Sequence, residues 1–296
     1  MIIFLPFAFF LGACFGSFLN VIILRIPEEK SIWRRSSHCF SCNAPIPFYN
    51  NIPILSYCLL RGRCSRCGAR FSPQYLIVEL LTALLFAATF YYRFHAIVPA
   101  LMDGVIPDWS LVQSALVPWL MDCTLLCCLI AMTWIDAVHF IIPLEITVTG
   151  FLVGFILCMW YPELKLVPAG LTAPASLMMK YWYTLGQIGM ALVAGGGLLL
   201  LVRWLGSLYF KREAMGLGDV HLMFMLAMFM NWNLILLTIF ISAFVGSIGG
   251  ITAKLIMRKS HWRFEIPYGP YLALGAVISY FWGARLISWY IAFFLK

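Results

Sequence analysis

Charged residues are scarce in this chain. Of its 296 residues, 11% are Asp, Glu, Lys or Arg and 63% are hydrophobic, whereas an ordinary soluble domain has about a quarter charged and about half apolar residues. The mean hydropathy of +0.92 agrees with this bias. The composition therefore excludes an ordinary soluble domain and predicts an all-α polytopic membrane protein in contact with membrane lipid.

The first 24 residues contain no basic side chain. A cleaved signal peptide starts with a basic region, so we expect 1–24 to form a transmembrane helix instead. The segment Leu11-Gly12-Ala13-Cys14 resembles a lipoprotein cleavage site. Because no basic residues precede it, a row of small residues for close helix packing is the simpler interpretation.

A glycine-rich loop of the kind that binds dinucleotides or methyl donors is not found in the sequence. Acidic residues are also few, and the formal net charge is +8. Basic residues collect on the cytoplasmic loops of membrane proteins, so this charge does not indicate a nucleic-acid partner. The distribution of the basic residues instead indicates which loops face the cytoplasm.

Apolar segments long enough to cross a bilayer, about 20 residues each, recur along the chain. They predict about eight transmembrane helices, near 2–24, 74–92, 113–135, 141–161, 183–205, 217–232, 234–256 and 268–293. Most of the 20 basic residues lie in 25–73 and in the loops before Gly216 and before the last helix. The positive-inside rule makes these segments cytoplasmic and both termini periplasmic. We therefore expect a first helix (1–24), a cytoplasmic domain (25–73) and a seven-helix membrane domain (74–296).

Two acidic residues fall at the same predicted membrane face. Asp136 ends the third predicted helix, and Asp219 begins the sixth, after Gly216 and Gly218. An acid at the membrane boundary is costly and indicates a functional site, while glycines let another backbone approach closely. Asp122 would lie about 21 Å from Asp136 along the same helix, too far to be its partner. Asp136 and Asp219 are therefore the candidate catalytic pair.

Four cysteines form two Cys-x-x-Cys pairs, Cys39 with Cys42 and Cys64 with Cys67. This spacing is typical of one tetrahedral zinc site. The cytoplasm disfavours disulfides, although a redox-active dithiol is the alternative. Four protein ligands leave no open coordination position, so we expect a structural Zn²⁺ in a small domain between the first two helices. Gly68 follows the second pair and suits a tight turn.

Several small or polar residues within apolar segments have two interpretations each. Glu79 is either a snorkelling or paired structural acid, or part of a site. The run Gly16 to Val21, which includes Asn20, either packs helices together or lines a site. His139 is either an interfacial side chain or orients a carboxylate. The run Gly195-Gly196-Gly197 allows close helix contact or a kink.

Two carboxyl groups at one membrane face suit the activation of water against a peptide bond. Neighbouring carboxyl groups do not both ionise easily, so the pair retains one proton. The ionised member takes a proton from the attacking water, and the protonated member donates to the scissile carbonyl oxygen. The rigid turn Pro267-Tyr268-Gly269-Pro270 either starts the last helix or walls this site.

The order of these motifs resembles that of the type IV prepilin peptidases, bacterial intramembrane aspartyl proteases with a Gly-x-Gly-Asp motif. The resemblance covers nearly the whole chain. It rests on these segments: Gly16-Ser17-Phe18-Leu19-Asn20-Val21 with Arg25-Ile26-Pro27, both cysteine pairs, Asp136 with Ile142-Pro143, Met215-Gly216-Leu217-Gly218-Asp219, and Ile266-Pro267-Tyr268-Gly269-Pro270. The family commonly has a Lys two residues after the motif Asp, whereas this chain has His221, which leaves the pH optimum open.

The resemblance implies two reactions at the cytoplasmic face of the bacterial inner membrane. Members cleave the basic leader from prepilins and pseudopilins, and many also N-methylate the new N-terminal residue with S-adenosylmethionine. The resemblance implies catalytic roles for Asp136 and Asp219, with Gly216 and Gly218 as the motif backbone. For the methyl-donor site we select Glu79 and Asn20.

Two alternatives stay open at this point. One is a peptidase without methyl transfer, which the intact cysteine pairs disfavour. The other is a transporter with a zinc-stabilised loop, in which acids spread through the membrane would relay protons. Asp122 is the residue that suits the transporter.

Overall fold

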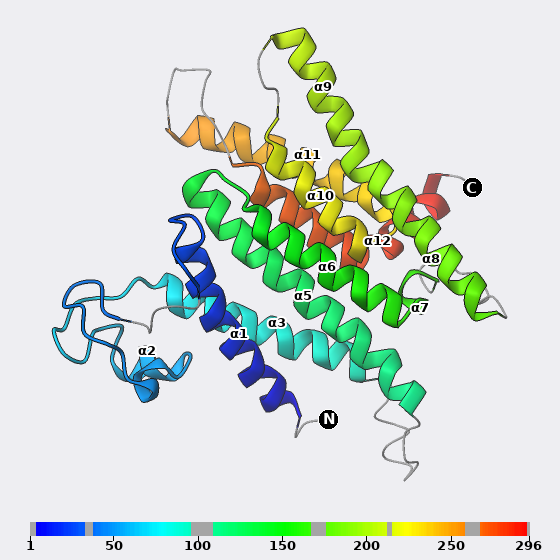
Figure 1. Cartoon of the computed structure of the whole chain (residues 1–296). Helices are drawn as coiled ribbons and strands as arrows, with labels where there is room; N and C mark the ends of the chain where they lie inside the picture. Colours follow the sequence, from blue (N-terminus) through cyan, green and yellow to red (C-terminus); the bar gives the residue numbers. More distant parts are fainter. Residues whose placement is uncertain are drawn as a thin grey trace. The chain divides into compact units, whose positions relative to one another are not determined.

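The computed structural model describes residues 4–32, 38–95, 109–166, 176–211, 215–257 and 267–294. In these ranges the regular elements are helices, with two isolated β-bridges, so the predicted all-α fold is confirmed. The chain forms two compact units, Met1–Ala131 and Met132–Lys296 (Figure 1). The domain limits predicted at 24 and 73 stay a prediction.

The first unit is built on two helices that pack closely, α1 (Leu5–Arg25) and α3 (Gln74–Phe94). A Cβ at Gly12 would lie 2.8 Å from Ala83 Cα, and one at Gly16 would lie 2.6 Å from Glu79 Cα. Glycine is therefore required for this approach, because any side chain would push the helices apart. Close packing is thus one role of the small residues in the first helix.

The start of α5 (Trp109–His139) completes the first unit. Trp119 and Cys123 of α5 join Phe86 of α3 and Ala8 of α1 in one apolar cluster. The segment between α1 and α3 carries a 3₁₀ turn, η1 (Phe48–Asn51), and a short helix, α2 (Leu55–Leu59). It also carries the four predicted metal ligands.

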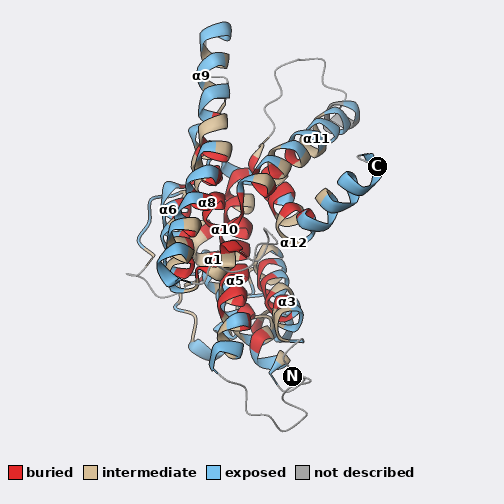
Figure 2. Ribbon diagram, turned by 90° about the vertical axis from the view of Figure 1, so that its right-hand side faces the viewer, coloured by how far each residue is buried: buried red, intermediate tan, exposed pale blue. Residues whose placement is uncertain are grey.

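The second unit surrounds a short, buried helix, α10 (Leu217–Phe229). Most of α10 is buried, whereas much of α9 is exposed (Figure 2). The helices around α10 in this unit are, in chain order, α6 (Leu144–Trp160), α8 (Leu177–Leu192), the π-helical segment η3 (Val193–Gly197), α9 (Leu198–Phe210), α11 (Trp232–Met257) and α12 (Gly269–Phe294). The helix that carries Asp219 is therefore held on several sides.

The glycine run joins α8 and α9, and it makes a close helix contact, one of its two predicted interpretations, with α10 and α11. A Cβ at Gly196 would lie 2.1 Å from Cε1 of Phe224, and one at Gly195 would lie 2.8 Å from a methyl carbon of Ile235. The backbone widens at this run into a π-helical turn, a rare element that occurs mostly as a single turn within an α-helix.

Six described helices or continuous helical segments are long and apolar enough to cross a membrane. These six segments are Leu5–Arg25, Gln74–Phe94, Trp109–His139, Leu177–Phe210, Trp232–Thr252 and Gly269–Phe294. Two shorter apolar helices, Leu144–Trp160 and Leu217–Phe229, fall at the other two positions predicted from sequence. The protein is thus a multi-pass membrane protein.

Candidate active site and metal centre

Asp136 lies in the last turn of α5 and is 6% exposed. Its Oδ2 atom accepts a hydrogen bond of 2.8 Å from the backbone N–H of Gly269, the first residue of α12. The four N-terminal N–H groups of a helix lack partners within the helix, so α12 supplies a donor that fixes the Asp136 carboxyl group. The chain turns directly after this site, where Phe140 has a φ of 57°.

Asp219 lies in the first turn of α10, where Gly216 is the N-cap residue. A carboxylate is favoured there because the N-terminus of a helix carries partial positive charge. Gly218 faces Ile142, and a Cβ on it would lie 2.8 Å from the Cβ of Ile142. The glycine therefore lets the start of α10 approach the segment that follows Asp136.

Three helix ends thus meet in the second unit: the end of α5 and the starts of α10 and α12. Asp136 and Asp219 are close enough for their charges to interact. Tyr268 also interacts electrostatically with Asp219, and its hydroxyl is 2.7 Å from that of Ser242. The arrangement brings two carboxyl groups together beside a half-buried hydroxyl, which suits proton transfer to and from a substrate.

Gly269 and Tyr268 were not selected as site residues from the sequence. The signal was present in the rigid turn Pro267-Tyr268-Gly269-Pro270, which had either a structural or a site-lining interpretation. The hydrogen bond to Asp136 shows that the turn does both, because it begins α12 and contacts a carboxyl group of the pair. Ile266 of the same motif lies outside the described residues.

The other polar residues of the membrane helices are placed differently. Asp122 is fully buried in the first unit and accepts two hydrogen bonds from Arg93, at 2.7 and 2.8 Å. This bidentate ion pair gives Asp122 a structural partner. His139 ends α5 as an exposed residue, as expected of an interfacial side chain.

The four cysteines predicted to bind metal come together in the first unit. The Sγ atoms of Cys39, Cys42, Cys64 and Cys67 all lie within 4.8 Å of one another. Zn–S bonds of about 2.3 Å would place the sulfurs of a tetrahedral site about 3.8 Å apart. Cys39 Sγ and Cys67 Sγ are 3.8 Å apart. The cluster can therefore hold one metal ion.

Both cysteine pairs lie on the same type of backbone turn. Cys39 donates its N–H to Ala44 O at 2.9 Å, and Cys64 donates its N–H to Ala69 O at 2.8 Å. The residue after each pair has a positive φ, 55° at Asn43 and 71° at Gly68, a conformation that Asn and Gly adopt most easily. The tight turn predicted at Gly68 is confirmed.

The turns also point backbone donors at the sulfurs. The N–H groups of Cys67 and Arg66 lower the pKa of the Cys64 thiol to about 6. Donors from Cys42 and Ser41 likewise lower the pKa of Cys39. The thiolate is the form that binds metal, so the backbone of each turn supports ligation.

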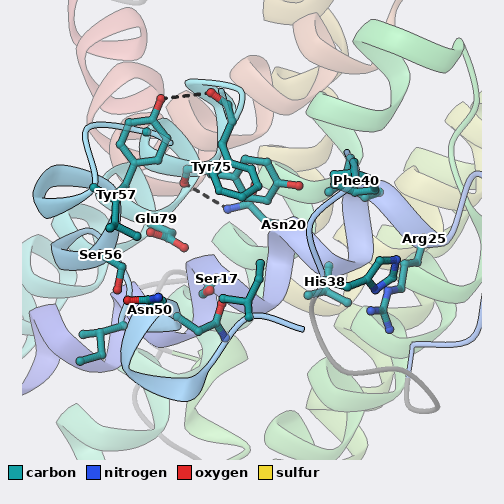
Figure 3. Close-up of a pocket in the computed structure, with 18 of the residues that line it drawn as sticks. Ser17, Asn20, Arg25, His38, Phe40, Asn50, Ser56, Tyr57, Tyr75 and Glu79 are labelled. Atoms are coloured by element: carbon teal, nitrogen blue, oxygen red, sulfur yellow. Dashed lines mark hydrogen bonds between the residues drawn. The ribbon is translucent and has the colours of Figure 1, made fainter. Parts of the chain in front are cut away.

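Glu79 and Asn20 line one cavity of about 590 Å³ in the first unit (Figure 3). Glu79 is 7% exposed and accepts a hydrogen bond of 2.7 Å from the N–H of Ile54. Asn20 is 2% exposed and donates through Nδ2 to Tyr75 O at 3.1 Å. Both residues therefore have a structural contact, and both line the same cavity.

Comparison with known proteins places these features in a family. Residues 10–93 match the model described as the bacterial peptidase A24 N-terminal domain, and residues 123–251 match that of the type IV leader peptidase family. No solved structure matches the chain.

Curated relatives are similar over most of the chain, and the three that follow are each named a prepilin leader peptidase/N-methyltransferase. The relative from Myxococcus xanthus is 35% identical over 89% of this chain and 67% of its own length. The relative from Aeromonas hydrophila is 30% identical over 97% of this chain and 93% of its own length. The relative from Pseudomonas aeruginosa is 31% identical over 96% of this chain and 92% of its own length.

Proposed function

The chain belongs to the type IV leader peptidase family, and we propose that it cleaves the leader from prepilins and pseudopilins and then methylates the new N-terminus. Family membership supports both reactions, because relatives named prepilin leader peptidase/N-methyltransferase align with nearly all of the chain. The geometry of the two units supports a set of residues for each reaction.

For cleavage, we propose Asp136 and Asp219 as the catalytic pair. The observation that carries this proposal is the meeting of α5, α10 and α12, which brings the two carboxyl groups within electrostatic range. Gly216 and Gly218 form the backbone in front of Asp219, and Gly218 has no side chain to block the approach to Ile142. Gly216 is the more open position, because the nearest atom to a Cβ there would be Asp219 Oδ2 at 3.6 Å. We propose that an extended substrate backbone approaches the acids beside Gly216.

The pair acts by moving protons. Two neighbouring carboxyl groups share one proton, because the second ionisation is opposed by the first negative charge. The ionised member removes a proton from water as the oxygen attacks the scissile carbonyl carbon. The protonated member donates to the carbonyl oxygen, and the nitrogen leaves as an amine after it receives a proton. The Gly269 N–H keeps Asp136 oriented during these steps.

For methylation, the new N-terminal amine is the nucleophile. S-adenosylmethionine supplies an activated methyl group on a sulfonium. The amine nitrogen forms the N–C bond as the C–S bond breaks, S-adenosylhomocysteine leaves, and the ammonium product releases one proton. The four cysteines would hold a structural Zn²⁺, which fixes the turns on which His38, Phe40 and Arg63 line the cavity.

The identity of the membrane and the orientation of the chain in it are also proposals. We place the chain in the bacterial inner membrane, with both termini periplasmic and the cysteine segment and the acid pair cytoplasmic. The concentration of Lys and Arg in 25–73 supports this orientation. Large apolar side chains on α9, such as Leu201, Trp204 and Leu208, are exposed and suit contact with lipid.

The transporter alternative loses its main support. It needed Asp122 as an acid available for a proton relay, but Asp122 is engaged by Arg93 in a bidentate ion pair. Separating Asp122 from Arg93 would leave an uncompensated buried charge, which is costly.

The proposed pair is tested with the purified full chain in detergent, a prepilin substrate and S-adenosylmethionine. Wild type is compared with Asp136→Asn and Asp219→Asn, and product mass reports cleavage and methylation together. We expect each variant to lose cleavage by about 10²- to 10⁴-fold, the usual contribution of a general acid or base.

Glu163→Gln is the matched control. It removes one negative charge from the same unit, and it lies in α7 (Glu163–Leu166), whose Lys165 binds the opposite end of α10 from Asp219. The control should cleave at the wild-type rate. An Asp136→Asn or Asp219→Asn protein that cleaves as well as this control would rule out the two-acid mechanism.

A further inference from the structure

We infer that the cavity of the first unit is the binding site for S-adenosylmethionine. Glu79 faces the sulfonium of this ligand, and Asn20 accepts a hydrogen bond from its adenine amino group or a ribose hydroxyl. This inference rests on the proposed methyl transfer. Six of the residues that line the cavity support it: Ser17, Asn20, Tyr57, Phe71, Tyr75 and Glu79. They come from α1, α2, α3 and the segment between the helices (Figure 3).

Asn20 has an unused acceptor. Its Nδ2 atom donates to Tyr75 O, but Oδ1 is buried and has no hydrogen-bond partner among the described residues. A buried polar atom without a partner is costly and rare. Because Asn20 lines the cavity, a bound ligand with an N–H or O–H donor would satisfy this oxygen. The adenine amino group and the ribose hydroxyls of the methyl donor are such donors.

Glu79 gives the same end of the cavity its negative charge. Its carboxylate is hydrogen-bonded by the Ile54 N–H and by Ser17, and both contacts hold it in place. Each carboxylate oxygen has two lone-pair positions, so these donors leave capacity for a ligand. A sulfonium is a fixed positive charge that cannot donate a hydrogen bond, and a held carboxylate is a suitable neighbour for it.

Aromatic side chains shape the cavity for a flat ring. The Tyr57 hydroxyl donates to Phe71 O at 3.4 Å, and Tyr75 packs edge-on against the Phe71 ring. Gly62 permits this position of Tyr57, since a Cβ there would lie 2.7 Å from Cζ of the ring. Aromatic faces bind both adenine rings and cations. The volume of about 590 Å³ also lies in the usual range for a small-ligand site.

Three basic side chains also line the cavity, Arg25, Lys30 and Arg63, together with a second acid, Glu28. Lys30 forms an ion pair with Glu28. Arg25 donates to the backbone oxygens of Ser31 and Ile32, both at 3.1 Å. The side chain therefore stabilises the end of α1. Glu79 lies on the Asn20 side of the cavity and supplies the negative charge for the sulfonium, while the basic side chains suit the carboxylate of S-adenosylmethionine.

The test measures binding to the purified full chain in detergent without a prepilin. Dissociation constants are determined for S-adenosylmethionine, which carries the sulfonium, and for S-adenosylhomocysteine, whose sulfur is neutral. Glu79→Gln should weaken binding of S-adenosylmethionine at least about tenfold and that of S-adenosylhomocysteine less than about threefold, because only the former loses an ionic contact. Asn20→Leu should weaken both ligands, and Glu163→Gln should weaken neither.

Ultraviolet cross-linking of methyl-tritiated S-adenosylmethionine to wild type locates the site without any variant. The label should be recovered on peptides from the first unit that line the cavity. Label on peptides from Met132–Lys296, or equal losses of the two ligands in Glu79→Gln, would overturn this assignment and leave the proposed methyl transfer standing. A wild-type chain that cleaves prepilin but binds neither ligand would overturn both.

Discussion

At the scale of single residues, one backbone contact controls the candidate active site. The N–H of Gly269 donates to Asp136 Oδ2, and a Cβ at Gly269 would lie 2.6 Å from that oxygen. Non-bonded heavy atoms do not approach so closely, so a side chain at this position must displace the carboxyl group. Glycine is therefore part of the mechanism proposed for Asp136, as a positioning residue.

We expect Gly269→Ala to lower the cleavage rate by about 10²-fold, because a displacement of about 1 Å at a catalytic group has an effect of that size. Gly189→Ala is the control, since nothing lies within 4 Å of a Cβ at Gly189 in α8. The measurement is the cleavage rate with saturating prepilin, together with the thermal midpoint of each variant. Wild-type cleavage by Gly269→Ala would show that the contact does not position Asp136.

At the scale of elements, the helix that carries Asp219 is fixed at its far end by a buried lysine. Lys165 of α7 is 1% exposed, and its Nζ donates to Ala227 O at 2.9 Å and to Met230 O at 2.6 Å. The last carbonyl groups of a helix lack partners within it and carry partial negative charge. Lys165 therefore caps α10 and keeps its position along the helix axis.

We expect Lys165→Met to lower the free energy of unfolding by about 2 to 4 kcal/mol, because two buried carbonyl oxygens lose their donor. Lys180→Met is the matched control. Lys180 is partly exposed and pairs with Glu163 at 2.8 Å, so its loss should be worth at most about 1 kcal/mol. The measurement is chemical unfolding of both variants in detergent. Equal stability of the two would mean that the cap does not stabilise α10.

At the scale of the whole molecule, the two proposed chemistries belong to different compact units. The cysteine cluster and the cavity lie within Met1–Ala131, and both candidate catalytic acids lie within Met132–Lys296. His38 and Phe40 flank the metal ligand Cys39 and also line the cavity. The metal site is therefore coupled by covalent neighbours to the proposed donor site.

We expect the purified chain to contain about one zinc ion, and chelation to lower methyl transfer at least about tenfold, since loss of a structural metal unfolds its ligand loop. Cleavage should fall much less, because neither acid is in the metal-binding unit. Mass spectrometry of the protein measures its zinc content, and the mass of the prepilin product measures cleavage and methylation. Cleavage that declines in step with methylation would contradict this separation, and so would metal-free wild type that methylates normally.

The sequence by itself was enough to predict the spanning helices, the two candidate catalytic acids and the four candidate metal ligands, because each of these signals is local. Long apolar runs specify spanning helices, an isolated acid stands out in them, and Cys-x-x-Cys spacing places two ligands on one turn. Only the tertiary structure decided that Gly269 binds Asp136, that Lys165 caps α10, that Arg93 engages Asp122, and that Asn20 and Glu79 share a cavity. These contacts join segments far apart in the chain, and they depend on how closely the helices pack, which no single stretch of sequence specifies.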